Sequence, residues 1–189
     1  MKMPFSEIPC LYGKRVTLKR LTLADADGLR ELTESLSVYR YLPTTLLEKQ
    51  NADAQEVICH LYDECLKESL ILGVFTDDAF CGLAEFYGYR APFLKVSVGY
   101  RLLPQYWGKG IATETLGLMV DYLMNQTKVK IITASTMLEN QASAHVLQKN
   151  GFKRVAHGVL ENWGYSMPIV TDKWIRTVTG YRQQYSFQT

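Results

Sequence analysis

The stretch that decides the fold spans residues 98 to 116 and reads VGYRLLPQYWGKGIATETL. Around its start, residues 96 to 101 alternate between apolar and more polar side chains, the two-residue period of a β-strand. Pro104 ends this strand, because proline has no N–H to donate to the ladder. From Ile111 to about Asn125, apolar side chains recur every three or four residues, which predicts an amphipathic helix.

Between the strand and the helix lies the loop 105–110, in which two glycines flank Lys109. The first backbone N–H groups of a helix have no intrahelical partner, and they point along the positive end of the helix dipole. Glycine also lets a ligand approach the backbone closely. The loop therefore predicts an anion site, most naturally for a phosphate or pyrophosphate.

Two common phosphate motifs do not fit this loop. A P-loop requires a glycine where Leu103 stands and a serine or threonine where Gly110 stands. A dinucleotide fingerprint that starts at Gly108 requires a third glycine where Thr113 stands.

The loop does match the pattern Gln-x-x-Gly-x-Gly between a strand and a helix. This pattern resembles the acetyl-coenzyme A motif of the GCN5-related N-acetyltransferase (GNAT) superfamily, and its flanks resemble the ribosomal-protein N-terminal acetyltransferase branch. A second stretch, from Asn140 through Ser143 and Leu147 to Phe152, looks like the superfamily's other signature and follows the next strand, as in the family. The resemblance covers the chain from about Arg15 to about Trp174.

The remaining periodicities complete a single α/β domain over residues 1–189, with a core from about 13 to 176 and a tail, 177–189, that we expect to be loose. The elements expected around the central stretch are a strand at 13–21, a helix capped by Thr22, a turn of helix at 38–42, helix within 48–68, a hairpin of 70–75 and 80–86, a strand at 130–137, a helix at 140–151, and strands at 152–156 and about 165–176. The resemblance implies a mixed sheet of six or seven strands, helices on both faces, and fourth and fifth strands that splay apart around the cofactor.

Composition excludes several classes of function. The 189 residues carry a formal charge of +2 and 47% apolar residues, without a basic cluster that would indicate nucleic-acid binding. No apolar run is long enough for a membrane span or a signal sequence, so we expect a soluble cytoplasmic protein. The four cysteines lack metal-ligand spacing, so we expect free thiols and no metal site. The oligomeric state stays open, a homodimer included.

The resemblance implies acetyl-CoA as cosubstrate, with its pyrophosphate on the backbone at the helix start and its pantetheine along the strand edge. It implies transfer of the acetyl group to a primary amine by direct attack in a ternary complex. The residues expected to hold the cosubstrate are Leu102, Leu103, Gln105, Trp107, Gly108, Lys109, Gly110, Ile111, Ala112, Thr113, Asn140 and Ser143.

Three residues are expected to act in the chemistry. Many family members carry a tyrosine at the position of Leu147 that protonates the departing thiolate; here the branch resemblance assigns a similar role to Ser143. A backbone N–H near Leu102 would stabilise the oxyanion. Glu85, in an apolar strand, would hold a proton more tightly than in water and could relay one from the acceptor.

Alternatives to these roles stay open on the sequence. Tyr87, Tyr89 and Tyr100 are other candidate members of a proton relay. The branch favours a protein or peptide N-terminal α-amine as acceptor, with an acetyltransferase of a small-molecule amine and a non-catalytic CoA-binding module as alternatives. A nucleotide-binding oxidoreductase is disfavoured by Thr113.

Overall fold

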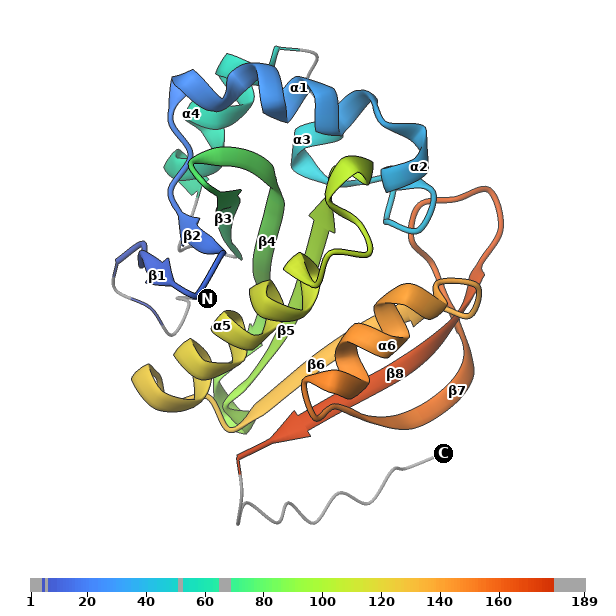
Figure 1. Ribbon diagram of the computed structural model, residues 1–189. Coiled ribbons are helices and arrows are strands. Elements are labelled where there is room, and N and C mark those ends of the chain that lie inside the picture. Colours follow the sequence, from blue (N-terminus) through green and yellow to red (C-terminus); the bar gives the residue numbers. More distant parts are fainter. Residues whose placement is uncertain (1–4, 6, 51–52, 65–68, 179–189) are drawn as a thin grey trace.

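The computed structural model describes residues 5, 7–50, 53–64 and 69–178. These residues form an eight-stranded mixed sheet in the order β1-β2-β3-β4-β5-β6-β8-β7 (Figure 1). The sheet has one strand more than the six or seven expected, and the additional strand is the two-residue β1, Leu11–Tyr12. This strand is too short to show a period of its own, and it forms by pairing with β2, Thr17–Lys19, across the turn at Gly13.

The strands and helices follow the expected order along the chain. The other strands are β3 (Ser69–Thr76), β4 (Ala79–Arg90), β5 (Lys95–Leu102), β6 (Ile131–Met137), β7 (Lys153–Glu161) and β8 (Ile169–Thr177). The α-helices are α1 (Ala26–Glu34), α2 (Leu36–Tyr39), α3 (Leu47–Gln50), α4 (Ala54–Glu64), α5 (Ile111–Gln126) and α6 (Gln141–Lys149), with short 3-10 turns at Leu23–Asp25, Ala91–Phe93 and Pro104–Tyr106.

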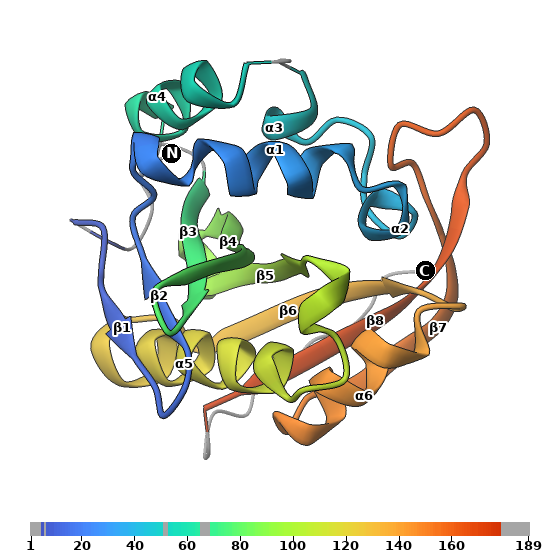
Figure 2. The ribbon, with the colours of Figure 1, turned by 45° about the horizontal axis from the view of Figure 1, so that its top comes forward.

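Helices cover both faces of the sheet, as predicted (Figure 2). Leu70, Leu72 and Val74 of β3 pack in the same core as α5, whereas Ile71 between them packs in a second core with α1 and α4. Successive strand residues point to opposite faces, so a continuous apolar run serves both cores. This explains why the sequence of β3 is a continuous apolar run and does not alternate between apolar and polar residues.

The fourth and fifth predicted strands, β5 and β6, do splay apart. They pair in parallel at three positions only, from Lys95 opposite Ile131 to Ser97 opposite Thr133. Beyond Ser97, β5 continues beside β4 as far as Leu102, and β6 continues beside β8 as far as Met137. Figure 1 shows the two strands diverging from their common start, with α5 and α6 in front of them.

Several local predictions are confirmed and two are refined. Thr22 forms a capping box with Asp25, and the Asn140 side chain accepts from the backbone N–H of Ser143 at the start of α6. The helix expected within 48–68 is divided into α3 and α4, and the strand expected at 152–156 extends to Glu161.

Two predictions concern parts of the chain that are not described: the loose tail falls almost entirely in 179–189, and Cys65 lies in 65–68. The other three cysteines are free thiols. Among the described helices, none combines the length and the apolar character needed to cross a bilayer.

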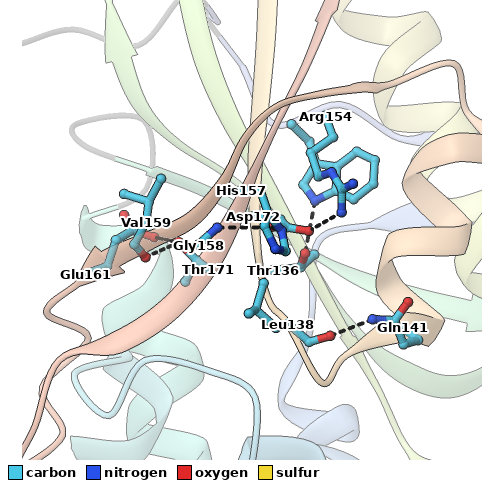
Figure 3. A network of polar contacts seen from close by, with 11 residues as sticks. Thr136, Leu138, Gln141, Arg154, His157, Gly158, Val159, Glu161, Thr171 and Asp172 are labelled. Carbon is cyan, nitrogen blue, oxygen red and sulfur yellow. Dashed lines mark hydrogen bonds and ion pairs between the residues drawn. The ribbon is translucent and has the colours of Figure 1, made fainter. Parts of the chain in front are cut away.

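A buried carboxylate holds the irregular pairing between β7 and β8 (Figure 3). Asp172 of β8 accepts from Arg154 Nη1 at 2.9 Å and from the backbone N–H of Gly158 at 3.4 Å, and its other close contact is His157 Nδ1 at 2.6 Å. These three residues lie where β7 bulges away from regular pairing. Burial alone would raise the pKa of Asp172, but the contacts to Arg154 and His157 outweigh it and lower the pKa.

We expect Asp172→Asn to lower the free energy of unfolding at pH 7 by about 1.5–3 kcal/mol, the range for hydrogen bonds to a charged group. Because the folded state lowers the pKa of Asp172, its contribution is complete above the unfolded pKa, about 3.9, and is lost as pH falls through the lower folded value. Urea unfolding between pH 7 and about pH 3 should therefore show the two proteins converging in acid.

The matched control is Asp27→Asn, which removes an exposed partner of Arg30 and should change stability little at any pH. A gap between wild type and Asp172→Asn that is constant with pH would contradict the linkage.

Candidate active site

The loop before α5 has the backbone that an anion site requires. Gly108 and Gly110 have φ of +71° and +79°, in the left-handed region that glycine adopts without strain. Gly110 is the N-cap of α5, so the amides that follow it open the helix without intrahelical partners. A Cβ placed on Gly108 would meet no atom within 4 Å, which leaves the loop open on that side for a ligand.

A brace from the N-terminal part of the chain holds this loop. Glu114, in the first turn of α5, accepts from the backbone N–H groups of Arg15 and Val16 at 2.7 and 3.1 Å, and Arg15 Nη1 donates to the carbonyl of Lys109 at 3.0 Å. Burial alone would raise the pKa of Glu114, but the hydrogen bonds from Arg15 and Val16 lower it. No local sequence pattern indicates this brace, because the partners are 99 residues apart.

A cavity of about 340 Å³ lies against the loop and the start of α5. Eight of the residues predicted to hold the cosubstrate line it: Leu102, Trp107, Gly108, Gly110, Ala112, Thr113, Asn140 and Ser143. The other four, Leu103, Gln105, Lys109 and Ile111, lie outside the lining. The Gln105 side chain bonds Glu31 at 3.1 Å instead. The lining adds His145 and Lys149 of α6, which the sequence analysis did not select.

A second cavity, of about 730 Å³, occupies the wedge where β5 and β6 part and extends under the loops after α2 and β7. The backbone N–H of Thr44 donates to the carbonyl of Trp163 at 2.9 Å and joins those two loops. Both cavities are lined by Tyr41, Leu42, Tyr100, Arg101, Asn140 and Ser143. The two cavities therefore lie side by side at these six side chains.

Ser143 lies at this junction and is hydrogen-bonded to Tyr100, with 3.1 Å between the two hydroxyl oxygens. Burial raises the pKa of Tyr100 to about 12, although the bond to Ser143 opposes the shift. Leu147, one turn further along α6, is 2% exposed in the core.

Glu85 does not have the apolar surroundings that we expected from its strand. Its Oε2 lies 2.9 Å from Arg101 Nη1, and Arg101 Nε lies 2.6 Å from Glu48 of α3. The Arg101 side chain is 3% exposed and that of Glu48 is 1% exposed. Burial alone would lower the pKa of Arg101, but the two carboxylates outweigh it and raise the pKa. A buried cation therefore faces Glu85, and its role as a base stays a prediction.

The end of β5 has some of its main-chain groups already engaged. The backbone N–H of Leu103 donates to the carbonyl of Cys81 at 2.8 Å, and the carbonyl of Leu102 accepts from Trp107 Nε1 at 2.7 Å. A carbonyl has a second lone pair, so the one on Leu102 can still accept from a ligand. The described residues include no group of three or more His, Cys, Asp or Glu that could hold a metal ion.

Two features, the parting of β5 from β6 and the glycine loop at the start of α5, indicate an acyltransferase that uses acetyl-CoA. Residues 15–153 match the family described as the acetyltransferase (GNAT) domain. The chain belongs to this family of N-acetyltransferases.

Individual relatives agree with this assignment. The chain is 32% identical over 156 residues to the probable N-acetyltransferase YjcK of Bacillus subtilis (strain 168), covering 76% of this chain and 83% of the relative. The fold is similar to RimL, a ribosomal alpha-N-protein acetyltransferase in complex with coenzyme A, with a TM-score of 0.77, 14% identity and coverage of 90% and 98%. It is also similar to a spermidine N-acetyltransferase (SpeG) chimera from Vibrio cholerae and hSSAT, with a TM-score of 0.69, 18% identity and coverage of 87% and 96%.

We expect Gly108→Val to weaken acetyl-CoA binding by about tenfold or more, because the side chain would cover the amides that the anion needs. The control is Gly158→Val on β7. Gly158 has nearly the same φ, +72°, and open surroundings, and it lies outside both cavities. Both changes should cost about 1–2 kcal/mol of backbone strain, so similar losses in thermal stability are expected.

Isothermal titration with acetyl-CoA measures the difference between the two variants. Equal dissociation constants for Gly108→Val and wild type would show that the anion site is elsewhere.

Proposed function

We propose that this N-acetyltransferase acetylates the N-terminal α-amine of a protein or peptide. The observation that carries the proposal is the second cavity, which meets the cosubstrate cavity at Tyr100 and Ser143 and extends for about 730 Å³ under two loops. A volume of this size has room for the first residues of a peptide as well as for a small amine. The fold similarity to RimL supports the same choice of acceptor.

The charges around the cavity argue against a polyamine. The described lining holds two acidic residues, Glu85 and Glu161, and three basic ones, Lys95, Arg101 and Lys173. Each acidic residue is already paired, Glu85 with Arg101 and Glu161 with Lys173. Glu48, which might have attracted a cation from the sequence alone, is buried against Arg101. A polycation would meet no excess of negative charge here, whereas a single ammonium needs only local contacts.

The proposed roles follow the geometry at the junction. The amides that follow Gly110 hold the pyrophosphate, and the main chain at Leu102 aligns the pantetheine and supplies the oxyanion donor. Ser143 gives a proton to the departing thiolate. Glu85, held by Arg101 in the lining of the acceptor cavity, attracts and orients the acceptor ammonium.

Thiol release from acetyl-CoA tests the acceptor class. The probes are a hexapeptide with a free N-terminus and one internal lysine, the same peptide with a formylated N-terminus, and spermidine. We expect turnover with the free peptide, mass-spectrometric acetylation at its α-amine, and no release above background with the blocked peptide. Ser143→Ala should lower kcat by about 100-fold, within the range for lost proton transfer.

Faster turnover of spermidine than of the free peptide would assign a small-amine acetyltransferase instead. Acetyl-CoA binding by calorimetry without turnover of any probe would indicate a non-catalytic CoA-binding module.

A further inference from the structure

The hydrogen bond between Tyr100 and Ser143 joins β5 to α6 at the point where the two cavities meet. Tyr100 lies near the end of β5, and Ser143 lies in the first turn of α6, 43 residues later. Because Ser143 lies in the first turn, no full helical turn precedes it to accept a bond from its hydroxyl, and the hydroxyl is paired with Tyr100 instead. Its backbone N–H is taken by the Asn140 side chain at 3.1 Å, which fixes the position of Ser143.

We propose that Tyr100 and Ser143 form a two-member proton wire that carries a proton from the acceptor nitrogen to the departing thiolate. The inference rests on the proposed function, because it needs an amine in one cavity and a thioester in the other. Each hydroxyl has one proton to give and lone pairs to accept another, so a chain of two can pass a proton without storing charge.

The step balances without any further reactant. The neutral amine forms the C–N bond and the C–S bond breaks. The nitrogen gives one proton to Tyr100 Oη, Tyr100 gives its own proton to Ser143 Oγ, and Ser143 gives its own proton to the sulfur. Both hydroxyls end in the protonation state in which they began. The ammonium form of the acceptor loses its first proton to solvent before attack.

Two features of the site favour this route over one through a carboxylate. The Glu85 Oε2 atom is already engaged by the Arg101 guanidinium at 2.9 Å. Tyr100 of β5 brings its hydroxyl to 3.1 Å from that of Ser143, and burial raises the pKa of Tyr100 to about 12.

The test compares Tyr100→Phe, Ser143→Ala and the double variant in single-turnover acetyl transfer from acetyl-CoA to the free hexapeptide. We expect each single change to slow transfer about 100-fold and the double variant to be no more than about threefold slower than either, because removing one member already breaks the wire. The control is Tyr122→Phe, which loses a phenolic hydroxyl in the Phe5–Phe86 cluster outside both cavities and should stay within about twofold of wild type.

A measurement without turnover separates a proton donor from a structural contact. The thiol of bound CoA can be titrated by the ultraviolet absorbance of its thiolate. A donating Ser143 hydroxyl stabilises the thiolate, so Ser143→Ala should move this titration to higher pH, and Tyr100→Phe should move it in the same direction by less. Acetyl-CoA affinity at pH 7 and the melting temperature should change little in both variants.

The wire is overturned if Tyr100→Phe transfers within about threefold of wild type, if the two losses multiply in the double variant, or if Ser143→Ala leaves the thiol titration unchanged. In those cases wild type still acetylates the peptide, so the proposed function stands. A wild-type protein that binds acetyl-CoA but acetylates neither the peptide nor spermidine overturns both.

Discussion

The parting of β5 from β6 after three paired positions is the constraint on which the site depends. A parallel pair that continued to Leu102 would fill the wedge and leave no room between the two strands. Because β4 holds the other edge of β5 and β8 holds the other edge of β6, each strand stays extended after the two separate. The unpaired end of β5 then offers main-chain groups to a ligand with amides of its own, beside the acceptor cavity in the wedge.

The wall of the acceptor cavity contains a buried group of charged side chains, and removing charges from water costs free energy. Arg101 contacts Glu85 of the neighbouring strand and Glu48 of α3, and Tyr39 of α2 donates to Glu48 at 3.0 Å. The group therefore ties the segment that covers the acceptor cavity to the strand that carries Tyr100 and Leu102. Moving α3 away from β5 would separate Glu48 from Arg101 and leave a buried charge unpaired. The ion pairs therefore hold the covering segment in place against the strand.

The sequence predicts the features of this structure that depend on residues close together in the chain. The glycine loop, the capping box at Thr22, the cap at Asn140 and the periods of β5 and α5 each involve neighbouring residues, and each is confirmed. The parting of β5 from β6 was predicted only from the resemblance to the family. The contacts that organise the site join distant positions, such as Glu114 with Arg15 and Tyr100 with Ser143, and no local pattern records them. Glu85 shows the consequence: its strand looks apolar, yet Arg101 on the next strand supplies a cation.

The most direct test of the account is a crystal structure of the protein with acetyl-CoA and a non-reactive peptide acceptor. The account predicts diphosphate density against the amides from Gly108 to Thr113, pantetheine along the end of β5, and the thioester sulfur within hydrogen-bonding reach of Ser143. Diphosphate density elsewhere, or a wedge closed by pairing of β5 with β6 beyond Ser97, would contradict it.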